Sequence, residues 1–182
     1  KYIPAYKIGS GDITWKEIII KIAKKNKPVL LACGASTLEE TIDAVRLILK
    51  YNKKVVLMQC NTNYTNEQSN INYINLNVIK QFKKIFKKKV ILGLSDHTKG
   101  HATVLGSITL GAKVIEKHFT DNNNRQGPDH KFSMNPKTWS EMVESSRQLE
   151  KSLGNGIKKI ERNEKESVVV QRRGVWTKKT LH

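Results

Sequence analysis

Five short apolar runs, each followed by a segment with helical periodicity, limit the folds open to this chain. The runs are continuous and partly β-branched rather than alternating with polar residues, so they are typical of strands buried on both faces. Strands that alternate with helices form a parallel sheet in α/β proteins. The predicted strands cover residues 6–9, 29–33, 55–60, 90–94 and 113–116.

Capping signals indicate where the first helices start. Thr14 with Glu17, and Ser36 with Glu39, have the spacing of a capping box, in which the two side chains bond each other's backbone N–H groups. Each pair stands just ahead of an apolar stripe with helical spacing. Two further helices are predicted from about residues 76 and 101.

The last predicted helix has signals at both ends. Asn135 is suited to the cap position, Pro136 to the first helical position, and Gly154 to the residue just past the end. The remaining segment, 157–182, is charged and poor in periodicity, so we expect a linker that leaves the domain formed by residues 1–156.

Two architectures accommodate five β–α units. A doubly wound sheet would be complete at this length and would concentrate its site at one switch point. A barrel would lack three strands, but it would gather all its βα loops at one mouth. Nearly every predicted strand is followed by polar or reactive side chains. The sequence therefore favours a partial (βα)₈ TIM barrel with parallel strands.

The charge balance bears on partners and location. Lys and Arg number 33 against 16 Asp and Glu, for a net charge of +17, which suits either a polyanion partner or a generally lysine-rich protein. No aromatic-studded basic stripe or nucleic-acid motif is present, so we expect solvated lysines and no nucleic acid.

No run approaches the ~18–20 apolar residues of a membrane span. Cys33 and Cys60 form no CxxC pair, so we expect reduced thiols in a cytoplasmic protein.

Two histidines stand at equivalent places. His97 and His118 each follow a predicted strand, in consecutive βα units. In a barrel they would lie side by side, and two neutral imidazoles with water and substrate oxygens suit a divalent cation. A structural role for each histidine is the alternative. His101 is four residues after His97, but Lys99-Gly100 between them indicates a strand-to-helix turn, so a helical histidine pair is the less favoured interpretation.

Other strand ends offer anion and sugar contacts. Lys7 precedes Gly9-Ser10-Gly11, where exposed backbone N–H groups and a lysine suit an anion, although a tight turn explains the glycines equally well. Ser95 could add a hydroxyl to the same anion. The long polar loop 121–134 includes a rigid Gly-Pro-Asp turn at Asp129, and it could face substrate or solvent. Asn61 to Tyr64 carry groups suited to a polyhydroxylated ligand.

Four collinear motifs resemble the sialic acid synthase family, which includes N-acetylneuraminate, legionaminate and pseudaminate synthases. The likeness covers about residues 4–175. The resemblance implies a (βα)₈ barrel followed by an antifreeze-like domain, and a homodimer. The motifs are Lys7-Ile8-Gly9-Ser10-Gly11-Asp12, Gly93-Leu94-Ser95-Asp96-His97-Thr98, Glu116-Lys117-His118-Phe119-Thr120 and Gly127-Pro128-Asp129.

The resemblance also implies an activity. Family members condense phosphoenolpyruvate with an N-acetylmannosamine-type sugar (an N-acyl hexosamine) to give a nine-carbon keto acid and phosphate, with Mn²⁺ or Mg²⁺. By position, His97 and His118 would hold the metal, Tyr64 and Asp129 would contact the sugar, and Asp12 would lie beside the reacting centre. Lys7 would bind phosphoenolpyruvate together with Ser10, Thr62 and Ser95. Lys7 and Asp12 are the candidate catalytic residues.

The chain departs from the family pattern after the second strand. Family members often carry Ser-Thr-Gly there, but this chain has Ala32-Cys33-Gly34, which removes a possible phosphate contact. The first barrel strands and the second domain are also expected to be missing, so we expect this segment alone to be inactive. The alternatives are another phosphoenolpyruvate–aldose synthase, an inactive carbohydrate-binding fragment, and a basic nucleic-acid-binding module.

Overall fold

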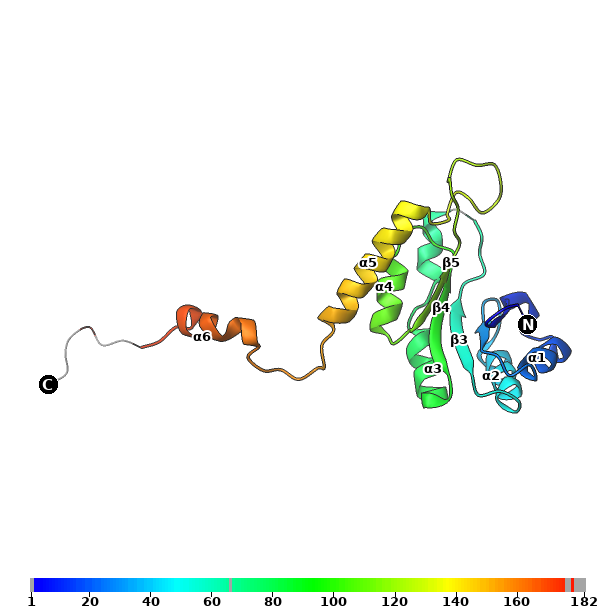
Figure 1. The fold of residues 1–182 in the computed structure, drawn as a ribbon, viewed down its shortest axis with the longest axis horizontal. Helices are drawn as coiled ribbons and strands as arrows, with labels where there is room; N and C mark the ends of the chain where they lie inside the picture. Colours follow the sequence, from blue (N-terminus) through cyan, green and yellow to red (C-terminus); the bar gives the residue numbers. More distant parts are fainter. Residues whose placement is uncertain (1, 66, 176–177, 179–182) are drawn as a thin grey trace. The chain divides into compact units, whose positions relative to one another are not determined.

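A computed structural model of the chain describes residues 2–65, 67–175 and 178. These residues belong to two compact units, Lys1–Ser152 and Leu153–His182. The first unit contains the sheet and all of the strand ends that the sequence singles out (Figure 1).

The sheet has five parallel strands in the order of the chain, β1-β2-β3-β4-β5. Each predicted run forms one strand, so the predicted fold class is confirmed as a parallel half-barrel. The order follows because each crossover helix returns the chain to the adjacent position. The strands are β1 (Tyr6–Ile8), β2 (Val29–Ala32), β3 (Val55–Cys60), β4 (Ile91–Asp96) and β5 (Val114–Lys117).

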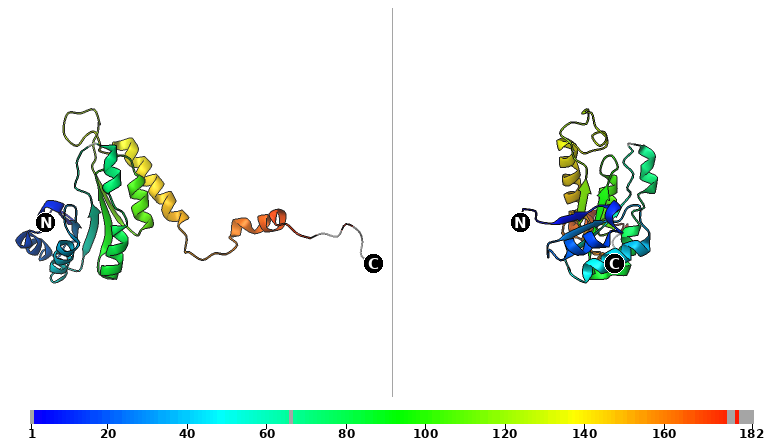
Figure 2. Two further views of the ribbon diagram at one scale, coloured as in Figure 1. Left: turned by 180° about the vertical axis from the view of Figure 1, so that it is seen from behind. Right: turned by 90° about the vertical axis from the view of Figure 1, so that its right-hand side faces the viewer.

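Helices α1 to α4 lie along one side of the sheet, as Figures 1 and 2 show from three directions. α5 packs against α4. The main core forms between these helices and the strand residues that face them, including Ile8, Leu31 and Leu57. The helices are α1 (Lys16–Ala23), α2 (Leu38–Leu49), α3 (Val78–Phe86), α4 (Ala102–Thr109) and α5 (Pro136–Ser152).

The capping box predicted at Ser36 and Glu39 is wrong by one residue. Thr37 caps α2 instead: its hydroxyl accepts from the Glu40 N–H at 3.2 Å, and the Glu40 carboxylate accepts from the Thr37 N–H at 2.7 Å. The Ser36 hydroxyl donates to the Cys33 carbonyl at 2.8 Å. Ser36 therefore closes the turn out of β2, which leaves the next hydroxyl to start the helix.

The box predicted at Thr14 and Glu17 is also wrong. The residue before α1 is Trp15, and no side chain caps this helix.

The start predicted for the last helix is confirmed. Asn135 Oδ1 accepts from the Thr138 N–H at 3.0 Å, and Thr138 Oγ1 accepts from the Asn135 N–H at 3.0 Å.

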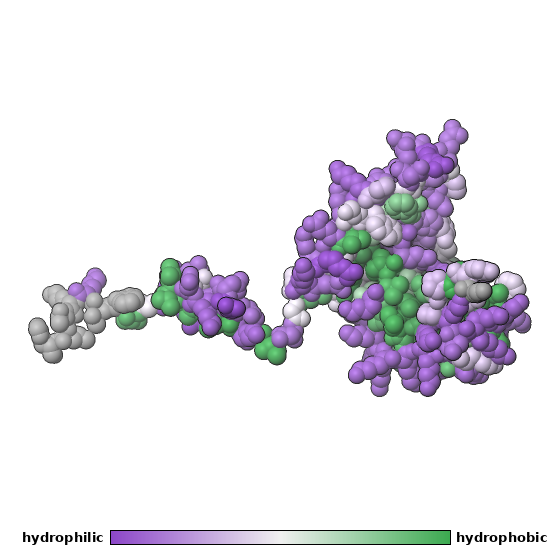
Figure 3. Space-filling view, in the orientation of Figure 1, coloured by the Kyte–Doolittle hydropathy of each residue, from purple (hydrophilic) through white to green (hydrophobic). Residues whose placement is uncertain are grey.

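Some apolar side chains lie on the face of the sheet turned away from the helices, outside the main core. Val56 and Met58 lie here, and Ile91 is 50% exposed; Figure 3 shows apolar side chains gathered in the middle of this unit. Gly93 is required beside them. A Cβ at Gly93 would come within 2.8 Å of the Val114 carbonyl oxygen and 3.0 Å of Met58 Cγ.

Lysines gather at the end of the sheet where the strands begin. The four segments that connect a helix to the next strand in this sheet contain no Asp or Glu. A helix C-terminus favours cations, which explains part of the excess. The lysines therefore concentrate opposite the strand ends that carry the candidate site. They are Lys24, Lys25, Lys27, Lys50, Lys53, Lys54, Lys87, Lys88, Lys89 and Lys113.

The second unit contains one short helix that the sequence did not predict, α6 (Lys165–Gln171). The predicted end of α5 is confirmed, because Gly154 has the left-handed φ of +58° that suits a residue past a helix end. In the part of the chain that the structure describes, no helix is long and apolar enough to span a membrane.

Candidate active site

The C-terminal ends of all five strands line one small cavity of about 100 Å³. Ala32 ends β2 at this cavity, and polar side chains come from β1, β3, β4 and β5 or from the residues just after them, because parallel strands bring their C-terminal ends to one edge. Of the predicted site residues, Lys7, Ser10, Tyr64, Ser95, His97 and His118 line this cavity.

The two predicted ligands, His97 and His118, lie side by side. Their ring centroids are 5.1 Å apart and the ring planes are inclined by 60°. His97 is 8% exposed. The strand register explains the pairing: Asp96 is opposite Lys117, so the residues that follow them are opposite as well.

Each ring is held at its Nδ1 atom. His97 Nδ1 lies 2.9 Å from the Asn61 carbonyl oxygen, and His118 Nδ1 lies 3.5 Å from Asp129 Oδ2. A carbonyl or carboxylate behind an imidazole is the arrangement that orients a metal-binding histidine and leaves Nε2 for the cation. The sequence singles out Asn61 for its side-chain amide; the contact with His97 is made by its backbone carbonyl, which has no signature in the sequence.

These groups fit a divalent cation that takes part of its coordination from substrate or water. Among the described residues, no three His, Cys, Asp or Glu side chains form a metal-binding cluster. The described residues therefore offer two imidazoles, and oxygen ligands would have to complete the coordination sphere.

Cys60 and His97 shift each other's ionisation. Burial alone would raise the pKa of the Cys60 thiol, but hydrogen bonds from His97 and Ser10 lower it below its usual value. Burial likewise opposes charge on His97, yet its contact with Cys60 raises the pKa of the imidazole. Burial and the charge of His97 lower the pKa of His118. The neutral form that metal binding needs is thus favoured at His118.

An aromatic wall encloses the histidine pair. The Tyr64 ring centroid lies 4.3 Å from that of His97 and 5.7 Å from that of His118. Phe132, which the sequence did not single out, is 3% exposed and lies 5.1 Å from the His118 ring. Burial raises the pKa of the Tyr64 phenol, with smaller contributions from Cys60 and Asp129. Tyr64 therefore stays a hydrogen-bond donor at neutral pH.

Lys7 and Glu116 join the first and last strands. Lys7 Nζ donates to Glu116 Oε2. Burial would raise the pKa of Glu116, but Lys7 and the Ser95 hydroxyl lower it. Glu116 belongs to one of the four sequence motifs, but the sequence alone assigns it no role. The alternation of strand side chains could have found it, because it lies two residues before His118 and so shares its face.

Ser10 is fixed by Gly34, which directly follows the two residues that depart from the family pattern, Ala32 and Cys33. Ser10 Oγ accepts from the Gly34 N–H at 2.9 Å. A Cβ at Gly34 would lie 1.9 Å from Thr62 Oγ1 and 2.9 Å from Ser10 Oγ, so only glycine fits. Cys33 is buried in the core among the helices. It supplies no group to the cavity.

Three predicted site residues lie outside the lining of the cavity. Asp12 is exposed on a 3-10 helix, Ser10–Asp12, at the mouth. Thr62 lies just behind the lining, with Oγ1 3.8 Å from Cys60 Sγ. Asp129 reaches the cavity only through His118. The roles assigned to these three residues remain predictions.

The loop 121–134 has its own internal framework. Thr120 Oγ1 lies 2.7 Å from His130 Nδ1, and Asn123 Nδ2 donates to the His130 carbonyl at 2.7 Å. A bridge between Phe119 and Met134 closes its base. The loop therefore holds Asp129 beside His118 in a defined position.

Comparison with known proteins shows the family of the chain. The NeuB family model matches residues 1–158. The chain is 37% identical over 179 residues to the N,N'-diacetyllegionaminic acid synthase of Campylobacter jejuni, covering 97% of this chain and 52% of that protein. It is 30% identical over 158 residues to human N-acetylneuraminate-9-phosphate synthase, covering 87% and 43%.

A solved structure shows the same arrangement of elements. The N-acetylneuraminic acid synthetase of Leptospira borgpetersenii superposes with a TM-score of 0.81 at 28% identity, over 93% of this chain and 58% of that one. The chain spans about half the length of the curated relatives it matches. With its motifs, half-barrel and family match in agreement, the chain belongs to the NeuB family.

Proposed function

We propose that this chain forms part of a synthase that condenses phosphoenolpyruvate with an N-acyl mannosamine-type sugar. The products would be a nine-carbon nonulosonic acid and phosphate. The observation that carries the proposal is the pairing of His97 and His118, 5.1 Å apart, in a cavity that Lys7 and Ser95 also line. An acid-rich or purely apolar cavity would not suit an anionic substrate.

The anion-binding side follows from the donors present. Lys7 would give an ammonium to the phosphate or carboxylate of phosphoenolpyruvate, and the hydroxyls of Ser10 and Ser95 would donate to the same groups. Lys7 already pairs with Glu116, so substrate would compete for this ammonium. Thr62 would support the site from behind Ser10 and Gly34.

The sugar side follows from the aromatic wall and its loop. The Tyr64 phenol and the Asp129 carboxylate would bond sugar hydroxyls, since a carboxylate can accept two of them. The imidazoles would hold Mn²⁺ or Mg²⁺, which supplies Lewis-acid polarisation of the sugar aldehyde when bound. Their Nδ1 partners, Asn61 and Asp129, would keep the Nε2 atoms directed at that place.

The bond changes then balance with water as the only further reactant. C3 of phosphoenolpyruvate forms a bond to the aldehyde carbon, and the aldehyde oxygen takes a proton to become a hydroxyl. Water adds at C2 and loses a proton, after which the C2–O bond to phosphate breaks and the keto group forms. Asp12 is the candidate for positioning the water or accepting its proton, from its place at the mouth.

The test is a chimeric synthase in which this chain replaces the matching segment of the C. jejuni enzyme. Purified chimera receives phosphoenolpyruvate, Mn²⁺ and a panel of N-acyl hexosamines, and phosphate release and product mass are recorded. We expect a keto acid three carbons longer than one of the sugars, and none from His97→Ala. A folded chimera, with a cooperative thermal transition, that releases no phosphate with any sugar would overturn the proposal.

A further inference from the structure

We propose that the buried ion pair between Asp96 and Lys117 is a positioning pair that sets the spacing of His97 and His118. The inference rests on the proposed function, because that function gives the two imidazoles their task. Neither Asp96 nor Lys117 contacts a reacting atom in it, so both act through the histidines that follow them.

The pair is enclosed, and each of its two charged groups has at least two hydrogen-bond partners. Lys117 Nζ lies 2.7 Å from Asp96 Oδ2, and the two side chains are 1% and 0% exposed. Lys117 also donates to the Thr98 carbonyl at 2.6 Å. Asp96 accepts from the hydroxyls of Thr98 at 2.9 Å and Thr103 at 2.6 Å, and from the Thr98 N–H at 3.1 Å. Among the described residues, no buried polar side chain lacks a partner.

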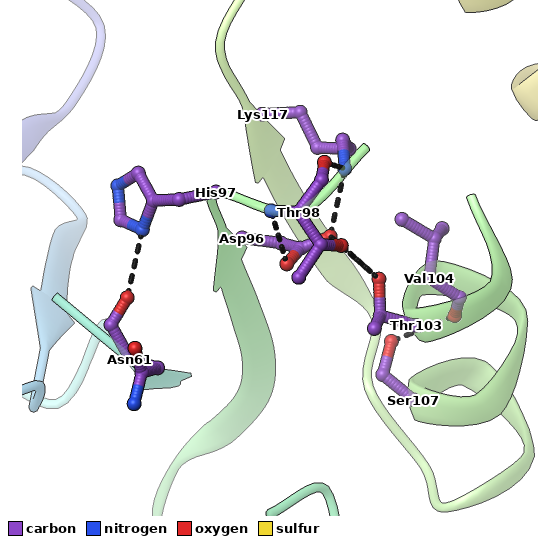
Figure 4. A network of polar contacts seen from close by, with 8 residues as sticks. All are labelled: Asn61, Asp96, His97, Thr98, Thr103, Val104, Ser107 and Lys117. Atoms are coloured by element: carbon purple, nitrogen blue, oxygen red, sulfur yellow. Dashed lines mark hydrogen bonds and ion pairs between the residues drawn. The ribbon is translucent and has the colours of Figure 1, made fainter. Parts of the chain in front are cut away.

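Figure 4 shows which way these side chains point. Asp96, Thr98 and Lys117 meet on the side of α4, whereas His97 projects the opposite way, toward Asn61. Successive strand residues point to opposite faces. The network therefore fixes the strand ends from the core side and leaves the imidazoles free on the cavity side.

The strand register couples the Asp96–Lys117 ion pair to both histidines. Asp96 lies opposite Lys117 in the ladder between β4 and β5. A slip of one residue would turn every following side chain to the other face. Two charges that are stable only when paired penalise such a slip strongly, so His97 and His118 emerge opposite each other.

Stability by itself is a weak reason for burying an ion pair, because taking the two charges out of water costs free energy. An ion pair removed from water often stabilises a fold no better than apolar residues of similar size, and its best-attested use is to specify register. The ion pair stands directly before the two histidines, which is where register matters for the site.

The test uses the full chain and three variants. The double variant Asp96→Leu with Lys117→Met removes both charges and leaves none unpaired. Thr103→Val removes one hydrogen bond to Asp96 and keeps the ion pair. Ile48→Ala, in α2 and 0% exposed, is a destabilised control that touches neither histidine.

Two measurements are made on each variant. Long-range ¹H–¹⁵N NMR reports the tautomer of each imidazole without any metal, and the EPR signal of free Mn²⁺ reports metal affinity. In the wild type we expect the Nδ1–H tautomer at His97, which the Asn61 carbonyl selects. In the folded double variant we expect that tautomer to be lost and the Kd for Mn²⁺ to rise at least about tenfold.

The outcomes separate this inference from the proposed function. Thr103→Val should raise the Kd by about threefold, and Ile48→Ala should leave tautomer and Kd unchanged per folded molecule. Wild-type tautomers in the folded double variant would overturn the inference. If that variant does not fold, unchanged tautomers in Thr103→Val would overturn it. A wild type that binds no Mn²⁺, with tautomers that still respond, would instead count against the proposed function.

Discussion

Ser10 Oγ accepts a hydrogen bond from the Gly34 N–H at 2.9 Å, which ties the end of β1 to the end of β2. This contact places a hydroxyl at the candidate phosphate site although Ala32 and Cys33, at the end of β2, carry none. Gly34 can approach so closely because it has no side chain.

Replacement of Gly34 should therefore damage phosphoenolpyruvate binding. In Gly34→Ala the new Cβ would lie 1.9 Å from Thr62 Oγ1, so Thr62 and Ser10 must move. We expect the KM for phosphoenolpyruvate in the chimeric synthase to rise on the order of tenfold, about 1.4 kcal/mol. The matched control is Gly11→Ala, whose Cβ meets nothing within 4 Å. An equal effect of both variants would contradict the account.

Asp129 should act on the sugar and not on phosphoenolpyruvate. Its carboxylate lies beside His118 and is not part of the cavity lining that includes Lys7. In Asp129→Asn we expect a higher KM for the sugar or a lower kcat, with the KM for phosphoenolpyruvate nearly unchanged. Asp121→Asn, in the same loop but paired with Arg125 at the surface, serves as the control. Equal losses for the two substrates would indicate a folding role for Asp129.

The two cysteines should differ sharply in reactivity. Burial raises the pKa of Cys33 to about 12, so roughly one thiol in ten thousand is ionised at pH 8. Cys60 has a lowered pKa and lines the cavity. Brief treatment of the native chain with iodoacetamide at pH 8, followed by peptide mass spectrometry, should find Cys60 alkylated first. Faster modification of Cys33 would contradict this assignment.

The same shift at Cys33 predicts a loss of stability at high pH. An unfolded thiol ionises near pH 9, whereas the folded one stays neutral to about pH 12. The contribution of Cys33 is thus complete below pH 9 and declines between pH 9 and 12. The difference in unfolding free energy between wild type and Cys33→Ala should shrink over that range. A difference that stays constant would show that the thiol is not protected.

The lysines where the strands begin should repel one another. Raising NaCl from 20 mM to about 500 mM should raise the thermal midpoint, because salt screens exposed charges of like sign. Replacing Lys87, Lys88 and Lys89 together by Gln should raise the midpoint at low salt and weaken its salt dependence. Replacing Lys158 and Lys159, in the second unit, should leave the midpoint of the first unit unchanged. A midpoint that falls with salt would contradict this repulsion.

The sequence predicts the sheet well because its strands are buried on both faces. Continuous apolar runs such as Val55–Cys60 leave little choice of structure, and the strand starts at Val29 and Val55 are as predicted. The residues that start a helix are predicted less precisely than the strands. Ser36 and Thr37 are both good helix caps, and only the turn out of β2 decides that Thr37 caps α2.

The histidine pair could be predicted because two strand ends repeat one pattern. Its surroundings could not, since they depend on register and on backbone atoms. The Asn61 carbonyl behind His97 and the packing of Phe132 arise only once β3, β4 and the loop 121–134 are assembled. The sequence predicts a reduced thiol at Cys60 without a partner, whereas the assembled sheet places this thiol against His97.

The most direct measurement is an anomalous difference map from crystals of the chain grown with Mn²⁺, recorded at the manganese edge. The account predicts one strong peak between His97 and His118, ~2.0–2.2 Å from each Nε2 atom. The peak should vanish in His118→Ala crystals of the same form. A peak elsewhere, or none at saturating Mn²⁺ with both rings in their present places, would contradict the claim that these two histidines share one cation.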